Sequence, residues 1–420
     1  MKKHFLTDQN NYKKTVLSNG VRVISEEIPY VRSLSIGAWV LVGSRDEQEK
    51  INGVTHLIEH MVFKGTKKRN VRMIAQSLES VGGYLNAFTS KEHTCYYARV
   101  LDEHAEKAID VISDLILNPL FDTKDLEKEK TVILEELKNC EDEPDEVIHD
   151  EFDRALFQPH PLAYNILGTR ETLESFKKPI IELYKNKFYT SDNIIISAAG
   201  NISHDKLVDL SSKYFGELKI SKNKQKRVLP KPKRNAVTVN IIKPVQQAHI
   251  CYGTRSFRIN DERRFPLLVL NTILGDGMAS RLYQSIRERQ ALAYSVYSFA
   301  NLLTDTGTFG VYVGTDKTKI NRTISLIKKE LETLVKKPIS KTELFRTKAQ
   351  VTGNMVLGLE SMSNRMIRLA KGEIYYGKFH TVDSLVEKIN RVDSSSIQKV
   401  AEDIFDLSKF NLITLLPENN

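Results

Sequence analysis

The order of strand-like and helix-like segments repeats once along this chain of 420 residues, and the repeat limits the possible folds more than any other feature. In the first half, hydrophobic periodicity predicts strands over 34–42 and 84–100, and helices near Val54 and over 71–81, 102–117 and 122–140. In the second half it predicts strands over 248–253, 294–300 and 308–313, and helices over 265–274, 280–289, 318–335 and 341–360. We therefore expect an α+β protein of two similar domains, each an antiparallel sheet covered by helices.

A basic segment over residues 221–234 separates the two halves, so we expect domains over 1–220 and 235–420. Between Lys219 and Arg234 there are eight basic residues and no acidic one, so this stretch holds almost all of the net charge of +9. The segment also contains Pro230 and Pro232, which is typical of a solvated linker. A nucleic-acid-binding arm is the less favoured alternative, because no aromatic stacking platform accompanies the positive charges.

The composition excludes several classes of protein. Hydrophobic residues make up 41% and charged residues 27% of the chain, as in soluble globular domains. No apolar run approaches the ~20 residues that a membrane-spanning helix needs, and residues 1–8 do not resemble a secretory signal. The three cysteines, Cys95, Cys140 and Cys251, form no C-x-x-C pair, so we expect free thiols. These observations predict a cytoplasmic protein with no membrane partner.

The helix predicted near Val54 carries polar residues where a buried helix would have none. His56, Glu59 and His60 share one face, and the apolar residues on the rest of the helix predict that it is largely buried. Burying two imidazoles and a carboxylate is costly unless they have partners, and a bound cation would satisfy all three. The i, i+4 spacing lets His56 and His60 reach one tetrahedral zinc ion, and Glu59 can take a proton from a water molecule there. The alternative is a pair of ordinary core histidines.

A third zinc ligand is expected on the helix over 122–140. Glu129 and Glu136 lie seven residues apart on its apolar stripe, where exposed carboxylates are unusual. Glu135 is the adjacent alternative, but it lies about 100° around the helix, toward a more polar side.

The string His56-x-x-Glu59-His60, followed at a distance by Glu136, resembles the inverted zinc motif of the pitrilysin and mitochondrial processing peptidase family. The length resembles that of the short bacterial members of this family. The resemblance implies that His56, His60 and Glu136 hold one zinc ion per chain and that Glu59 is the general base. It further implies that Glu129 supports the site.

Two other segments extend the resemblance. Residues 84–90 resemble the edge strand on which the family binds extended peptides, which implies substrate contacts by Asn86 and Ala87. An ordinary amphipathic strand is the alternative there. Residues 280–296 resemble the segment that holds an arginine and a tyrosine of the family, which implies that Arg287 and Tyr294 hold the peptide carbonyl.

The resemblance predicts a zinc-dependent endopeptidase that cleaves unfolded or extended peptides by Glu59-assisted attack of a zinc-activated water. Ten acidic residues and one basic residue over 135–153 favour peptides with basic residues near the cut, although this stretch could equally be a solvated surface. Short members of the family usually pair, so we expect a homodimer, in which Arg287 and Tyr294 of one subunit could serve the zinc site of the other. The alternative is a non-catalytic peptide-binding or assembly subunit with the same fold.

Overall fold

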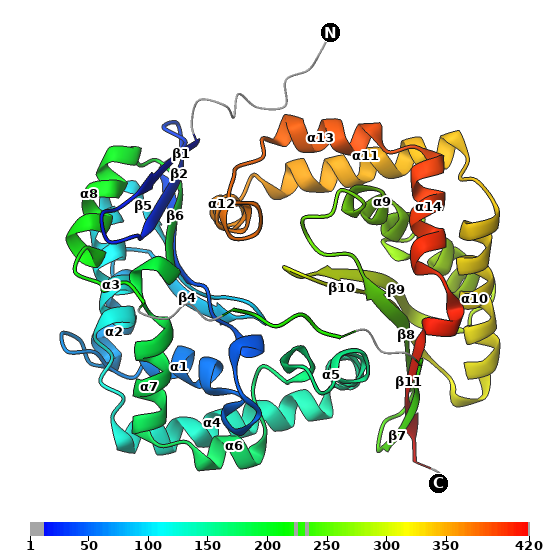
Figure 1. Cartoon of the computed structure of the whole chain (residues 1–420), viewed down its shortest axis with the longest axis horizontal. Helices are drawn as coiled ribbons and strands as arrows, with labels where there is room; N and C mark the ends of the chain where they lie inside the picture. The colour runs from blue at the N-terminus through cyan, green and yellow to red at the C-terminus, as the bar shows by residue number, and fades with distance from the viewer. Residues whose placement is uncertain (1–11, 222–225, 232–234, 419–420) are drawn as a thin grey trace. The chain divides into compact units, whose positions relative to one another are not determined.

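The computed structural model describes residues 12–221, 226–231 and 235–418 (Figure 1). The first residues of the chain, on which the signal-peptide prediction rests, and parts of the predicted linker lie outside the described residues. The chain divides into two compact units: unit 1 comprises 1–138, 164–227 and 358–381, and unit 2 comprises 139–163, 228–357 and 382–420. One division falls between Arg227 and Val228, inside the predicted linker. The units differ from two contiguous halves. Residues 139–163 of the first half belong to unit 2, and residues 358–381 of the second half belong to unit 1.

Unit 1 is built on a six-stranded sheet in the order β1-β2-β6-β3-β5-β4. Its strands are β1 (Tyr12–Val16), β2 (Arg22–Glu27), β3 (Ser33–Val40), β4 (Tyr84–Thr89), β5 (Thr94–Leu101) and β6 (Ile194–Gly200). Neighbouring strands are antiparallel except β2 and β6, which are parallel. The strand predicted over 84–100 is a hairpin, in which the amide of Ser90 donates to the carbonyl of His93 at 2.9 Å. As a result, β4 lies at one edge of the sheet.

Helices cover both faces of this sheet (Figure 1). On one face lie α3 (Ala105–Leu117) and α8 (His204–Phe215). On the other lies α12 (Met362–Tyr376), whose Met366, Leu369 and Ala370 form a buried cluster with Trp39 and Ile195. The remaining helices of the unit are α1 (Val54–Val62), α2 (Val71–Glu79), α4 (Thr123–Asp142, which continues into unit 2), α6 (Arg170–Ser175) and α7 (Lys178–Phe188).

Unit 2 repeats this topology with a five-stranded sheet in the order β7-β11-β8-β10-β9. Its strands are β7 (Thr238–Lys243), β8 (Ala248–Ser256), β9 (Ala293–Leu302), β10 (Gly307–Thr315) and β11 (Asn411–Pro417). The parallel pair β7 and β11 corresponds to β2 and β6, and the edge strand β9 corresponds to β4. The matching strand order and directions confirm the internal repeat. Each sheet is thus antiparallel apart from one parallel pair.

Helices also cover the second sheet. One face is covered by a helix from the exchanged segment, α5 (Pro144–Phe157), whose Ile148 and Phe152 pack with Tyr312 and Leu415. The other helices of unit 2 are α9 (Arg264–Gly275), α10 (Ile320–Lys336), α11 (Lys341–Gly358), α13 (Val382–Arg391) and α14 (Ser394–Ile404). The helix predicted over 280–289 contains a π-helical turn, Tyr283–Glu288. Among the described residues, no disulfide joins Cys95, Cys140 and Cys251. No helix in the described part of the chain is long and apolar enough to cross a bilayer.

A buried histidine in unit 1 gives a test of this packing. His93 is 4% exposed, and its Nδ1 atom has no hydrogen-bond partner among the residues that the structure describes. Its ring centroid lies 5.2 Å from that of Trp39, the only tryptophan of the chain. Burial, aided by the charges of Lys371 and Arg227, lowers the pKa of His93 from 6.5 to about 3. The unfolded chain therefore binds one more proton than the folded chain between those two pH values.

We expect His93→Phe to reduce the acid sensitivity of unit 1. As pH falls below 6.5, the wild-type free energy of unfolding should fall by up to about 1.4 kcal/mol per pH unit because of His93 alone. Phenylalanine keeps the ring packing without the proton. Urea unfolding followed by Trp39 fluorescence at pH 7 and pH 4.5 should show a loss smaller by about 2 kcal/mol in the variant. Equal losses in both proteins would contradict the buried neutral histidine.

Candidate metal centre

The helix α1 begins at a backbone position that requires glycine. Its N-cap residue, Gly53, has a φ of 92°, and a Cβ atom there would lie 2.5 Å from the carbonyl oxygen of Leu167. Gly53 has no side chain to cap the helix, so the buried carboxylate of Glu47 caps it instead. It accepts hydrogen bonds from the amides of Gly53 and Thr55, both at 2.8 Å, and from Asn52 Nδ2 at 2.9 Å. The start of α1 at Val54 is therefore fixed two residues before His56.

The three predicted ligands come together within unit 1. Glu136 Oε2, on α4, lies 3.9 Å from His56 Nε2 and 3.6 Å from His60 Nε2, both on α1. One ligand atom from each residue lies within 4.8 Å of the others, close enough to share one ion. It is the only such group of His, Cys, Asp and Glu side chains found in the described part of the chain.

The chemistry of these groups fits a zinc ion. Burial, with the charge of His60, lowers the pKa of His56 to about 3, so its imidazole is neutral near pH 7 and can donate a lone pair to a metal. Two imidazoles and one carboxylate make up a common protein ligand set for zinc that leaves a position open. The cluster favours a metal site over the ordinary core histidines that were the alternative.

The structure separates Glu136 from its neighbour Glu135. The Glu135 side chain is 60% exposed and forms an ion pair with Lys138 at 2.5 Å, one turn along α4. It does not belong to the ligand cluster. The choice of Glu136 from the apolar stripe of this helix therefore agrees with the geometry.

Glu129 contacts His60 on the side of the ring opposite the cluster. His60 Nδ1 lies 2.8 Å from Glu129 Oε1, and the other carboxylate oxygen, Oε2, lies 2.7 Å from Lys64 Nζ. Burial alone would lower the pKa of His60, but the hydrogen bond to Glu129 and the charges of Glu136 and Glu59 outweigh it and raise that pKa. Sequence reasoning found Glu129 but missed Lys64, four residues after His60.

Glu59 forms a hydrogen bond to the edge strand. Thr89 Oγ1, at the end of β4, donates a hydrogen bond to Glu59 Oε2 at 2.5 Å. Burial raises the pKa of Glu59, an effect that the Thr89 hydrogen bond and the charge of His60 partly offset. Thr89 is a second residue that sequence reasoning missed, because only the folded hairpin brings β4 beside α1.

The predicted substrate residues Asn86 and Ala87 lie on β4, the edge strand of this sheet. Among the described strands, β4 pairs with β5 alone, so its other side has backbone groups available to a further strand. Asn86 Oδ1 accepts from the amide of Ala87 at 2.8 Å, and Asn86 Nδ2 donates to the hydroxyl of Tyr84 at 2.6 Å. The edge position agrees with the strand that the sequence resembles, and the peptide contacts stay a prediction.

Arg287 and Tyr294 meet each other within unit 2. Arg287 Nη1 donates to the carbonyl of Tyr294 at 2.8 Å, and the Arg287 guanidinium carbon lies 4.4 Å from the centroid of the Tyr294 ring and 4.8 Å from that of Tyr283. The Tyr294 side chain is exposed. Their predicted role as a substrate clamp stays a prediction, as does the homodimer.

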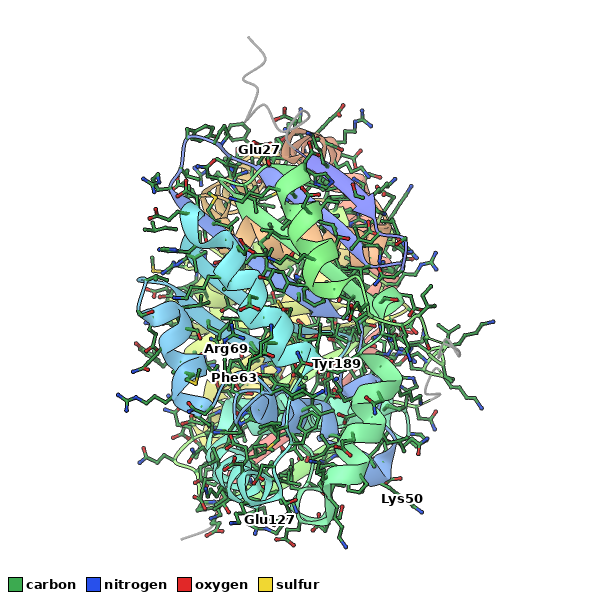
Figure 2. The ribbon with its side chains drawn as sticks, turned by 90° about the vertical axis from the view of Figure 1, so that its left-hand side faces the viewer. Glu27, Lys50, Phe63, Arg69, Glu127 and Tyr189 are labelled. Atoms are coloured by element: carbon green, nitrogen blue, oxygen red, sulfur yellow. The ribbon has the colours of Figure 1, made fainter. Side chains whose placement is uncertain are left out.

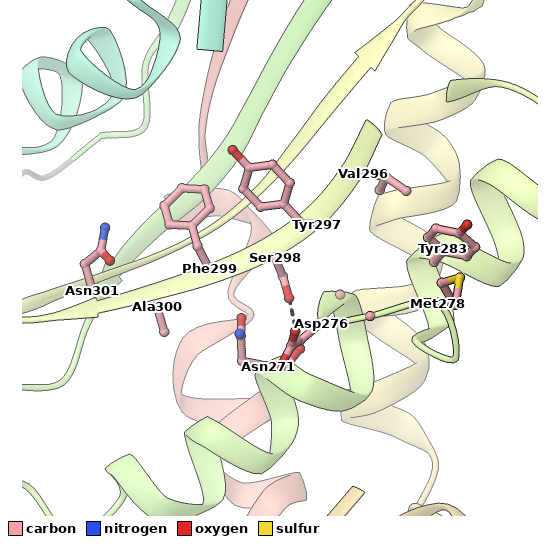
Figure 3. A pocket seen from close by; sticks show the side chains of 12 residues that line it. Asn271, Asp276, Met278, Tyr283, Val296, Tyr297, Ser298, Phe299, Ala300 and Asn301 are labelled. Atoms are coloured by element: carbon pink, nitrogen blue, oxygen red, sulfur yellow. Dashed lines mark hydrogen bonds between the residues drawn. The ribbon is translucent and has the colours of Figure 1, made fainter. Parts of the chain in front are cut away.

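A cavity of about 590 Å³ lies in unit 2 between the end of α9 and the edge strand β9 (Figure 3). Ser298 of β9 donates to the carbonyl of Asn271 on α9 at 3.0 Å. In the repeat, α9 and β9 correspond to α1 and β4 of unit 1. However, α9 contains neither histidine nor glutamate, so the second half has no counterpart of the ligand cluster at this place.

Comparisons with known proteins match most of the chain to one peptidase family. Residues 22–170 match the family model described as Insulinase (Peptidase family M16), and residues 178–351 match Peptidase M16 inactive domain. The uncharacterized zinc protease YmxG of Bacillus subtilis is 41% identical over 97% of this chain and 99% of its own length. An uncharacterized zinc protease of Streptomyces coelicolor is 37% identical over 93% of this chain and 87% of its own length.

Solved structures show the same fold at lower identity. A protease from Helicobacter pylori superposes with a TM-score of 0.89 at 21% identity, covering 97% of this chain and 99% of that one. A peptidase M16 inactive domain from Pseudomonas fluorescens superposes with a TM-score of 0.91 at 19% identity, with the same coverage. These matches confirm the predicted pair of sheet-and-helix domains. The chain therefore belongs to peptidase family M16, the insulinase and pitrilysin family that its sequence resembles.

Proposed function

We propose that this protein is a zinc-dependent endopeptidase that cleaves extended peptides. The observation that carries the proposal is the ligand cluster itself: His56, His60 and Glu136 converge to within 4.8 Å, with Glu59 on the same helix as the two histidines. The names of the zinc protease relatives support the choice of metal. His56, His60 and Glu136 would hold the ion.

The ion and the side chains have separate tasks in this mechanism. Zinc, when bound, supplies a Lewis acid that activates a water molecule and polarises the scissile carbonyl. Glu59 accepts a proton from the attacking water and returns it to the departing amine. Its raised pKa, caused mainly by burial, suits a group that must both take and release a proton. Thr89 holds one Glu59 oxygen at 2.5 Å, which leaves the other available to the water.

The substrate would bind as an added strand on β4. An extended peptide can pair with the available edge of this strand through main-chain hydrogen bonds, which recognise an extended backbone more than a particular sequence. Thr89 belongs both to this strand and to the contact with Glu59. A peptide paired along β4 would therefore pass the general base.

We further propose that substrates carry basic residues near the cut. The helix α5 begins two residues after the end of α4 and carries Asp145, Glu146 and Asp150. Burial, reinforced by the charges of Asp145, Asp150 and Glu143, raises the pKa of Glu146. Clustered carboxylates attract cationic side chains, which favours substrates that contain arginine or lysine.

The test is cleavage of quenched fluorescent peptides by the zinc-loaded full-length chain. Three unstructured peptides of equal length with basic, neutral or acidic flanks should be cut in that order of decreasing rate. Removing the metal with a chelator should abolish cleavage, and added zinc should restore it. Zinc binding without cleavage of any peptide would support a peptide-binding subunit instead. Equal rates for all three peptides would reject only the preference for basic residues.

A further inference from the structure

The Glu129 carboxylate is shared between a predicted zinc ligand and a lysine to which no role is yet assigned. Its side chain is 5% exposed, and each of its oxygens has one close partner: Oε1 the ring of His60 at 2.8 Å, and Oε2 the ammonium group of Lys64 at 2.7 Å. A buried carboxylate keeps a fixed orientation only while its partners stay in place. The position of Lys64 therefore bears directly on His60.

Lys64 is well placed for this contact. It follows α1, and its amide donates to the carbonyl of Met61 at 3.1 Å, which fixes its backbone against the last turn of the helix. Lys64 is four residues after His60, so both side chains reach the same carboxylate on α4. The ion pair of Lys64 with Glu129 also connects the end of α1, which carries His56 and His60, to α4, which carries Glu136.

The two histidines differ in how they are held. His60 has Glu129 on its Nδ1 side, whereas His56 Nδ1 is buried and has no hydrogen-bond partner in the described part of the chain. His60 is thus the ligand whose orientation depends on a neighbour outside the cluster. Partners of this kind fix the ring and the tautomer of a metal-ligating histidine, and losing one typically weakens metal affinity about 10- to 100-fold.

From this geometry we infer that Lys64 is a positioning residue of the zinc site, acting through Glu129. Its ammonium group holds Glu129 so that the Nδ1 of His60 donates to the carboxylate and the Nε2 of His60 faces the ion. An ordinary exposed ion pair would have no such effect. This inference rests on the proposed function in one respect: it takes the ion bound by the ligand cluster to be zinc.

The experiment measures zinc affinity, not activity, by competition with a chelator of known affinity on the full-length chain at pH 7.5. We expect Lys64→Gln to bind zinc about tenfold more weakly and Lys64→Arg to stay within about threefold of the wild type. Lys68→Gln is the matched control, because Lys68 is 55% exposed and pairs with Asp110 at 3.1 Å, away from the cluster. It should bind zinc as the wild type does. Circular dichroism of the metal-free proteins checks that each variant is folded.

A double variant decides whether the effect passes through Glu129. In a Glu129→Gln background, Lys64→Gln should weaken zinc binding no further. A full additional tenfold loss there would overturn the inference, and so would wild-type affinity in Lys64→Gln alone. If the wild type itself failed to bind zinc, the proposed function would be overturned together with this inference, an outcome distinct from the other two.

Discussion

Glu59→Gln is expected to bind zinc as tightly as the wild type and to cleave peptides at least about 100-fold more slowly, because general base catalysis contributes roughly 10²- to 10⁴-fold. Glutamine has nearly the same shape, and its amide oxygen can still accept the hydrogen bond that Thr89 now donates to Glu59 Oε2 at 2.5 Å. It cannot take a proton from water. The loss should therefore appear in kcat, with zinc content unchanged.

The control for this variant is Glu127→Gln. Glu127 lies on α4, its side chain is 63% exposed, and it is labelled at the periphery of unit 1 in Figure 2. This substitution also removes one carboxylate, but one that is exposed and pairs with Lys130 at 2.9 Å, so cleavage should stay at the wild-type rate. Retention of more than a tenth of the activity in Glu59→Gln would mean that another group takes the proton. Simultaneous loss of zinc would mean that Glu59 helps to hold the metal.

Much of the site could be predicted because its residues obey helical periodicity. His56 and His60 are one turn apart on α1, and Glu129 and Glu136 are two turns apart on α4, so each pair had to share a face. The apolar stripe of α4 also separated Glu136 from Glu135. The repeat of strands and helices indicated two similar domains, because each half contained the same succession of periodic segments.

Contacts between distant elements could not be predicted in the same way. The helix α12 is held on the first sheet by ion pairs of Arg365 with Glu26 and of Glu373 with Lys14, although each pair spans more than 300 positions. Periodicity shows which face of α12 is apolar, but not which sheet it covers. For this reason the sequence predicted two contiguous domains, and the exchange of α5 and α12 appears only in the structure.

The β4–β5 hairpin was missed for a local reason. Its turn, Ser90-Lys91-Glu92-His93, contains no glycine, proline or asparagine. The sequence therefore showed no break between the two strand-like segments, and they were predicted as one strand. The structure closes the turn with side chains: Ser90 Oγ donates to the carbonyl of His93 at 2.8 Å. Without the hairpin, Thr89 could not be placed beside Glu59, so the hydrogen bond between these two residues was not predicted.

The ligand assignment on α4 leads to the second large expected effect. Glu136→Gln should lower zinc affinity by more than about 100-fold, since removing a neighbour of a ligand already costs 10- to 100-fold and a neutral amide is a poor substitute for a carboxylate ligand. Glu135→Gln, one residue away and 60% exposed, should bind zinc as the wild type does, although it loses its ion pair with Lys138.

The pair of variants is informative because both make the same chemical change on the same helix and differ only in the face they alter. Competition with a chelator gives both affinities under one set of conditions. If Glu135→Gln lost zinc and Glu136→Gln kept it, α4 would have to be rotated by about 100° from the structure described, since that angle separates adjacent residues on a helix. If both kept zinc, the third ligand would come from outside α4. His56 and His60 would then bind the ion without the carboxylate that now lies 3.9 and 3.6 Å from their Nε2 atoms.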